Sequence, residues 1–429
     1  MMIVGHPVAS SGMAGKVSFD GVLRAMRNPD FALYTYSNTA SMIGEWIQRV
    51  GVGWLTWELT QSTTWLGIIA CADMIVTMVV SPIAGAYADR IDRLRYAQLT
   101  LVFSTLHPLA LALLYFFGAL DIWALFLLAL YSGLLGGFNQ AARLAIIPHL
   151  VDRADLSPAV ASSSITYNIS RFIGPAIADS VIAVAGVGYT FLLNLLLTVS
   201  FTISLYFIKI NDMESPKRSG NHILQDTVEG IRYTIRHPGI GPVMFLLVVG
   251  SLGQRSFIEL LPGYVDLVFT RGPEAFGWMV SMIGMGALLG AIYLALRQNL
   301  VGLTKASVHM TLVGAVMLIA FALNDSFYLA MACLLLVGVS LSVSSTGIMT
   351  LVQAAVDNNM RGRVLSLYGL IFRGGPAIGA LAMGFAAERI GLHIPIALGG
   401  VFCILLWAWV ARNLSRTAAE LETQSEPQK

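Results

Sequence analysis

The sequence has 429 residues, of which 56% are hydrophobic and only 12% are charged. Soluble domains carry about 25% charged residues, so this composition excludes an ordinary soluble enzyme or binding module and indicates a chain solvated by lipid. The formal net charge of +2 is too small to indicate a nucleic-acid partner.

Apolar stretches of membrane-spanning length follow one another along the chain. A bilayer core of about 30 Å needs about 20 mainly apolar residues per helix. Residues 1–30 are too polar for a cleavable signal peptide, and we expect a cytoplasmic segment with a short amphipathic helix there. The sequence then predicts an all-α membrane protein with twelve spans, near 31–57, 64–87, 96–118, 122–148, 156–184, 188–209, 240–268, 275–297, 303–323, 327–353, 363–387 and 392–411.

The spans divide into two halves. We expect an N-terminal six-helix bundle (31–209), a cytoplasmic linker with a second amphipathic helix (210–239), a C-terminal six-helix bundle (240–411) and a cytoplasmic tail (412–429). An internal repeat supports this division. Residues 20–29 recur as 229–238, each with an acidic residue before glycine and an arginine two residues before proline. Residues 167–177 recur as 368–378, from a tyrosine to a Gly-Pro-Ala-Ile sequence. Transporters built from parallel repeats bind their substrate near the midplane, between the repeats.

Basic residues indicate the orientation. If both termini are cytoplasmic, the outer loops hold few basic residues beyond Arg271 and Arg389. The inner loops then hold the others, Arg90, Arg93, Arg95, Arg153, Lys209, Lys217, Arg218, Arg232, Arg236, Lys305, Arg361, Arg363 and Arg412. This asymmetry follows the positive-inside rule.

The loop after the second span carries the most specific motif. It reads Gly85, Ala86, Tyr87, Ala88, Asp89, Arg90, Ile91, Asp92, Arg93, Leu94, Arg95. It resembles the signature loop of the major facilitator superfamily. Asp92 stands where glycine is frequent, and this variant, together with residues 53–62, is similar to the branch that contains siderophore exporters and macrolide efflux proteins.

The resemblance implies roles for two motifs. In this family the loop bridges the halves in the outward-facing state, which implies that Asp89 meets residues 363–365 and that Arg90 and Arg93 pair with acids such as Asp152 or Asp155. A solvated charged loop is the alternative. The Gly174-Pro175 segment resembles the family's antiporter motif, with Gly375-Pro376 as its counterpart in the second half. Ordinary helix packing by small residues is the alternative for these glycines.

Ionisable residues within the spans are the candidate site. A charge at bilayer depth costs about 2.5–3.5 kcal/mol or more, so each one should face a cavity or a partner. Glu45 and Arg49 lie one helical turn apart, a spacing that permits an ion pair, and Arg255 and Glu259 are also one turn apart. The candidates that line the transport cavity or couple transport to protons are Glu45, Arg49, Asp73, Arg171, Arg255, Glu259 and Arg373. Static salt bridges between helices are the alternative role for each.

These features predict a secondary active transporter. The resemblance implies that it exports a small, moderately hydrophobic molecule, drug or siderophore-like, from the cytoplasm across a bacterial inner membrane by alternating access. Glu45 or Asp73 would carry an antiported proton, while Arg49 and Arg255 would tune that carboxylate or contact an anionic group of the substrate. An importer or a lipid-moving member of the same fold is the alternative.

Other classes of function have little support in the sequence. It contains no Walker loop and no hydrolase motif, so an integral-membrane enzyme is disfavoured. Cys71, Cys333 and Cys403 are widely separated in apolar stretches, which predicts neither a disulfide framework nor a metal site. We expect a monomer that needs no cofactor beyond a proton gradient.

Overall fold

Helices account for all regular structure in the described part of the chain. The computed structural model describes residues 19–88, 92–152, 155–209, 223–297, 299–357 and 359–422. The first group of helices is α1 (Phe19–Ala25), α2 (Pro29–Thr60), α3 (Thr63–Ala88), α4 (Arg93–Phe116), α5 (Ile122–Leu150), α6 (Leu156–Ala185) and α7 (Gly188–Ser204). The second group is α8 (Ile223–Arg236), α9 (Ile240–Gly253), the 3-10 helix η2 (Ser256–Leu260), α10 (Leu261–Leu267), α11 (Pro273–Leu296), α12 (Leu303–Ala322), α13 (Phe327–Ala355), α14 (Arg361–Ile390), α15 (His393–Ala411) and α16 (Leu414–Glu422).

Local sequence explains where several helices begin. The Asn28 side chain accepts hydrogen bonds from the backbone N–H groups of Asp30 and Phe31, and Pro29 occupies the first turn of α2. Asp92 and Asp121 cap α4 and α5 in the same way. Such caps satisfy N–H groups that have no partner within the helix, so they define the entry of the chain into each span.

Nine helical segments in the described ranges are long and apolar enough to cross a membrane. They are α3, α4, α5, the segment from α9 to α10, and α11 to α15. Helices α2 and α6 are also long, with 32 and 30 residues, and α7 is an apolar helix of 17 residues. Together these twelve helical segments fit the twelve predicted spans, although only nine of them in the described ranges meet the length and hydropathy criteria for a membrane span.

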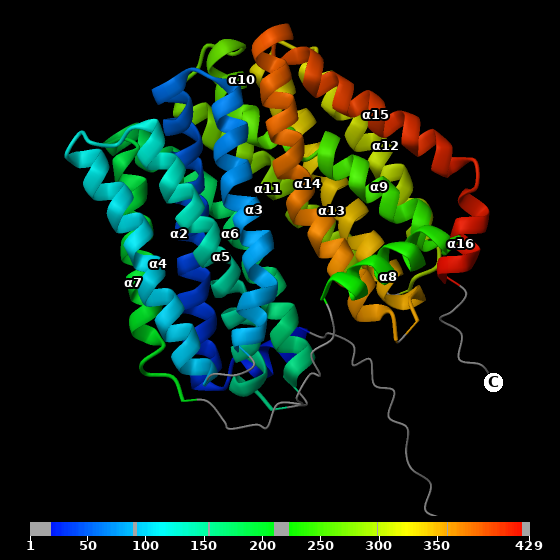
Figure 1. Cartoon of the computed structure of the whole chain (residues 1–429), viewed down its shortest axis with the longest axis horizontal. Helices are drawn as coiled ribbons and strands as arrows, with labels where there is room; N and C mark the ends of the chain where they lie inside the picture. Colours follow the sequence, from blue (N-terminus) through cyan, green and yellow to red (C-terminus); the bar gives the residue numbers. More distant parts are fainter. Residues whose placement is uncertain are drawn as a thin grey trace, which may run out of the picture.

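The helices form two bundles (Figure 1). Helices α2 to α7 pack among themselves, as do α9 and α11 to α15, and contacts of α3 with α14 and of α6 with α11 join the two bundles. The bundles approach one another at the end where α10 lies and separate toward the end where α8 lies (Figure 1). We call these the α10 end and the α8 end.

Glycines allow the two bundles to approach closely. A Cβ atom on Gly67 of α3 would lie 2.7 Å from the backbone oxygen of Ala380 on α14. A Cβ atom on Gly284 of α11 would lie 2.6 Å from the backbone oxygen of Arg171 on α6. Both distances are shorter than real side chains tolerate, so these positions require glycine for the observed packing.

The sequence repeat has a structural counterpart in α6 and α14. Each helix has 30 residues and contains one of the repeated prolines, Pro175 or Pro376. Each is followed by a glycine with positive φ, at 96° for Gly186 and 80° for Gly391. A positive φ favours glycine, which ends a helix at low steric cost.

Two predicted segments differ from the structure. The predicted seventh span is interrupted, because α9 ends at Gly253 and the chain continues through η2 into α10. The predicted C-terminal tail contains α16, where both Glu422 carboxylate oxygens accept backbone hydrogen bonds at the start of α12, from Gly302 (2.7 Å) and Thr304 (3.0 Å). The polar composition of residues 414–422 concealed this docked helix.

Candidate functional site

An ion pair between the bundles marks the candidate site. Arg49, on α2, donates from Nη2 to Oε1 of Glu259, in η2, at 2.5 Å. A second contact between the bundles runs from Arg373 on α14 to the amide oxygen of Gln140 on α5. The candidate residues of the two halves therefore meet between the bundles.

The break in the predicted seventh span positions Arg255 and Glu259. Both residues lie at or within η2, so they are not successive residues on one α-helical face. The one-turn spacing expected of these two residues is therefore not kept in the structure. Glu259 binds Arg49, while Arg255 donates to the backbone oxygen of Phe372 at 3.3 Å and stacks 3.8 Å from the centre of its ring.

The ion pair that spacing permits between Glu45 and Arg49 is replaced by pairs with other helices. Glu45 does not bind Arg49 but accepts from Nη2 of Arg143, on α5, at 2.5 Å. The sequence pattern identified the charged residues but not their partners. Spacing reports only neighbours on one helix, whereas here the opposite charges come from other helices.

Asp73 lies near the middle of α3 and beside this group. The Ser132 hydroxyl, on α5, is a hydrogen-bonding partner of its carboxylate, and the charges of Arg49, Glu259 and Glu45 act on it. The close packing of α3 and α5 places it there, since a Cβ atom on Gly133 would lie 2.3 Å from the backbone oxygen of Asp73. Three acidic side chains from α2, α3 and η2 thus share one region.

Tyr167 is the centre of a group of basic residues. It lies on α6, one turn before Arg171, and the charges of Arg171, Arg255, Arg49 and Arg373 all act on its hydroxyl group. Its ring centre lies 6.2 Å from that of Trp46. Four arginines from α2, α6, the α9–η2 junction and α14 are therefore gathered around one aromatic side chain.

These side chains are exposed although they lie deep within long helices. The side chains of Glu45 and Arg49 are 51% and 41% exposed, and Tyr167 is 39% exposed. Charged groups at bilayer depth face a partner or a water-filled cavity, because lipid cannot solvate them. The exposure therefore indicates a space between the bundles that water and a solute can reach.

A different set of contacts joins the bundles at the α10 end. Trp57 of α2 donates from Nε1 to Oδ2 of Asp266 on α10 at 2.8 Å. Glu388 of α14 accepts from the hydroxyl groups of Ser62 and Thr64, the latter at 2.6 Å. Sequence reasoning missed these contacts, since single polar residues at span ends have no distinctive pattern. They close the space between the bundles at this end.

The structure describes only part of the signature loop, residues 85–95, which is predicted to bridge the two halves. Asp89 and Arg90 lie outside the described residues, and so does the predicted contact of Asp89 with residues 363–365. Gly85 lies near the end of α3, and a Cβ atom on it would have no described atom within 4 Å. Asp92 caps α4, because its carboxylate accepts a hydrogen bond from the Arg95 backbone N–H at 2.8 Å.

The predicted partner of Arg93 differs from the observed one. Arg93 contacts the ring of His149, at the end of α5. Asp155, one of its two predicted partners, is instead bound by Arg24 of α1 at 2.6 Å. The N-terminal helix α1 lies against α6 and supplies the competing arginine.

The repeated Gly-Pro motifs lie at close helix–helix contacts within each bundle. A Cβ atom on Gly174 would lie 2.5 Å from Cβ of Trp46 on α2, and one on Gly375 would lie 2.6 Å from Cβ of Ser251 on α9. Pro175 and Pro376 follow directly within α6 and α14. Gly174 therefore holds α6 against the segment of α2 that carries Glu45, Trp46 and Arg49.

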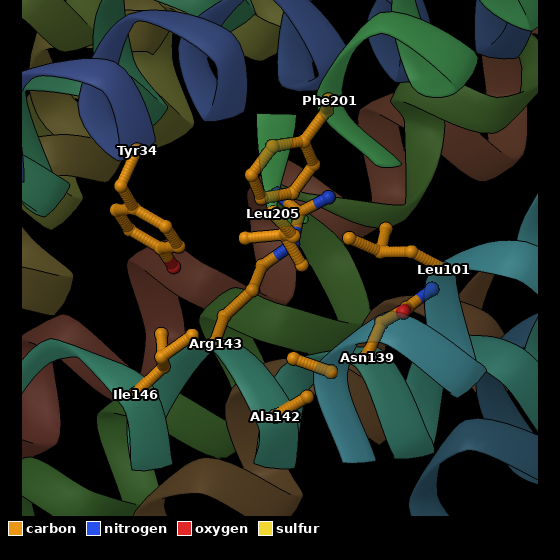
Figure 2. A pocket seen from close by; sticks show the side chains of 9 residues that line it. Tyr34, Leu101, Asn139, Ala142, Arg143, Ile146, Phe201 and Leu205 are labelled. Carbon is orange, nitrogen blue, oxygen red and sulfur yellow. The ribbon is translucent and has the colours of Figure 1, made fainter. Parts of the chain in front are cut away.

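A small pocket lies inside the N-terminal bundle, beside Arg143 (Figure 2). The centre of a water molecule can move within about 10 Å³ of this pocket, which is about the space that one water needs. Small-molecule sites usually enclose about 300–1,000 Å³, so this pocket is too small for a substrate. Nη1 of Arg143 and Oδ1 of Asn139 are buried without hydrogen-bond partners in the described part of the chain.

Comparison with known sequences gives relatives that transport small molecules. The chain is 25% identical over 368 residues to the staphyloferrin A transporter of Staphylococcus aureus (strain NCTC 8325 / PS 47), covering 85% of this chain and 91% of the relative. It is 26% identical over 330 residues to the enterobactin exporter EntS of Escherichia coli O1:K1 / APEC, covering 77% and 76%. It is also 26% identical over 383 residues to the multidrug efflux pump Tap of Mycolicibacterium fortuitum, covering 85% and 92%.

Solved structures share the fold at low sequence identity. A bacterial homologue of the human lysosomal transporter Spinster, inward-facing and unoccupied, has a TM-score of 0.70 and 12% identity, covering 96% of this chain and 100% of that one. A bacterial homologue of the iron transporter ferroportin, inward-facing, has a TM-score of 0.66 and 16% identity, covering 91% and 99%. Residues 21–429 match the sequence profile described as a transmembrane secretion effector, so the chain belongs to this family (MFS_3) of the major facilitator superfamily.

Proposed function

We propose that this protein exports a small, moderately hydrophobic molecule by alternating access, driven by protons that enter as the molecule leaves. One observation carries the proposal: ionisable side chains of both bundles, among them Glu45 and Arg49 of α2 and Arg373 of α14, are exposed near the middle of long helices where the bundles meet. Export by the enterobactin exporter and the multidrug efflux pump among the relatives supports the direction.

The site takes up its substrate from the α8 end. The contacts of Trp57 with Asp266 and of Glu388 with Ser62 and Thr64 close the α10 end. Basic residues, among them Arg93 and Arg363, gather at the α8 end, which by the positive-inside rule faces the cytoplasm. Export then requires the bundles to rock, so that the α10 end opens while the α8 end closes.

Glu45 or Asp73 carries the coupling proton. Protonation of Glu45 removes the charge that holds Arg143 of α5, so it loosens a contact between α2 and α5. Protonation of Asp73 removes a negative charge that acts on Arg49, whose ion pair with Glu259 joins the bundles. Either event changes the electrostatic balance of the contacts that the rocking motion must rearrange.

Reconstituted vesicles test the proposal. The purified protein is placed in liposomes, a pH gradient is imposed, and the movement of a panel of fluorescent dyes and the accompanying proton flux are recorded. We expect Glu45→Gln or Asp73→Asn to reduce proton-driven dye movement at least about tenfold, since transfer of a proton at a positioned side chain typically contributes that much or more. Dye binding should persist in the same variant.

Glu58→Gln is the matched control. Glu58 lies on α2 like Glu45 and is exposed, and it has no hydrogen bond or ion pair within the described ranges. This variant should transport like the unmodified protein. If Glu45→Gln and Asp73→Asn both retain full proton-driven transport, neither carboxylate carries the proton and the proposed coupling is wrong.

A further inference from the structure

Three of the clustered arginines have no acidic partner among the described residues. Arg49 is paired with Glu259, and Glu45 is paired with Arg143. Arg171, Arg255 and Arg373 form no ion pair with any described residue. Their polar contacts are with neutral groups, a backbone oxygen for Arg255 and the Gln140 amide for Arg373. Among the described residues, the site therefore carries more positive than negative charge.

Aromatic stacking leaves the donors of these arginines available. The Arg255 guanidinium lies 3.8 Å from the centre of the Phe372 ring, and the Arg171 guanidinium lies 5.9 Å from the Trp46 ring. A stacked guanidinium keeps its N–H groups in its own plane, pointing away from the ring face. In that orientation it can donate two parallel hydrogen bonds to a planar carboxylate.

The candidate site contains both acidic and basic side chains. Glu45, Asp73 and Glu259 belong to α2, α3 and η2, and two of them already hold arginines. The three unpaired arginines surround Tyr167, whose side chain is 39% exposed.

We propose that Arg171, Arg255 and Arg373 bind the carboxylate groups of an anionic substrate, and that Trp46, Tyr167 and Phe372 contact a flat apolar part of the same molecule. This inference rests on the proposed export function, and it names the substrate class: organic anions with an aromatic or similarly planar portion. A cationic molecule of the same size and shape is disfavoured, because it would face three uncompensated guanidinium groups.

Two dyes with the same ring system but opposite charge test this substrate class. Fluorescein is an anion that carries a carboxylate, and tetramethylrosamine is a cation that lacks one. Binding to the full-length protein in lipid nanodiscs is measured for both dyes by fluorescence polarisation. We expect fluorescein to bind at least about tenfold more tightly than tetramethylrosamine, and the difference to shrink as salt is added.

Single variants assign the effect to the arginines. Arg171→Gln, Arg255→Gln and Arg373→Gln should each weaken fluorescein binding about tenfold or more, because each removes a charged donor. Arg255→Lys keeps the charge but loses the planar fork, so it should restore only part of the affinity. Arg389→Gln is the control, because Arg389 lies on α14 like Arg373 but stacks on Phe385 of its own helix.

The outcomes separate this inference from the export proposal. Fluorescein binding that is absent, weaker than that of tetramethylrosamine, or unchanged in all three glutamine variants would overturn the anion site. If the vesicles transport tetramethylrosamine but not fluorescein, export stands and the anion site is wrong. If fluorescein binds as expected but a pH gradient moves neither dye, the anion site stands and proton-driven export fails.

Discussion

At the scale of single residues, the Arg49–Glu259 pair joins the two bundles at the site. The pair is partly exposed, with 41% of the Arg49 side chain accessible, and pairs of this kind contribute about 1 kcal/mol or less to stability. We therefore expect Arg49→Gln or Glu259→Gln to leave the thermal midpoint of unfolding nearly unchanged. Each change should reduce the transport rate at least about tenfold, because it removes one charge-assisted hydrogen bond that forms and breaks during the transport cycle.

The reversed pair separates the charge interaction from the identity of the residues. The double variant Arg49→Glu with Glu259→Arg should recover part of the transport that each single reversal loses. Transport rates and thermal midpoints of the four proteins provide the measurement. A double variant as inactive as the worse single variant would show that the pair does more than attract the bundles.

The residues of this site could be predicted from the sequence, but their partners could not. A charge inside an apolar span is costly, so Glu45, Arg49, Asp73 and Arg255 stood out at once. Their contacts depend on Arg143 of α5 and on the break before Glu259, neither of which follows from spacing along one helix. The acceptors at the α10 end, Asp266 and Glu388, could not be recognised for the same reason.

At the scale of elements, the contact of α3 with α14 holds the α10 end closed. Gly67→Ala adds a Cβ atom 2.7 Å from backbone atoms of Ala380 and Leu381, which cannot move without shifting α14. We expect this change to separate the two helices at the α10 end and to lower the thermal midpoint, consistent with the roughly 1–3 kcal/mol typical of overpacking.

A buried reporter at the same contact measures the opening. The Thr63 side chain is 4% exposed and donates to the backbone oxygen of Gly384 at 2.7 Å. A Thr63→Cys reporter should react faster with a membrane-impermeant maleimide when Gly67→Ala is present. Gly369→Ala is the control, since no atom lies within 4 Å of a Cβ atom at that position on α14. Equal labelling rates in both backgrounds would contradict this role of Gly67.

Hydropathy predicted most helices to within a few residues, but not the interruption between α9 and α10. The apolar stretch runs on through residues 240–267 and meets the criteria for one span. The helix ends at Gly253, where α9 packs closely on α15: a Cβ atom on Gly253 would lie 2.7 Å from the backbone oxygen of Gly399. Contacts with a distant helix are absent from a local hydropathy pattern.

At the scale of the whole molecule, the repeat and the charge asymmetry predict that both termini lie on the cytoplasmic side. The three cysteines, Cys71, Cys333 and Cys403, are buried and are replaced with alanine before single cysteines are introduced. We expect Ser415→Cys to react with an impermeant maleimide only from the cytoplasm, and Asp325→Cys only from outside. Reaction of both from the same side would contradict the predicted topology.

The central claim is that the bundles rock about the charged group, so that the two ends open in turn. Spin labels at Ala119 and Asp325 report the separation of the bundles at the α10 end, and labels at Phe207 and Val301 report it at the α8 end. Electron spin resonance distances are measured for both pairs as the pH is lowered in the presence of a transported substrate. The account predicts that the α10-end distance lengthens while the α8-end distance shortens; two unchanged distances, or two that change in the same direction, would contradict it.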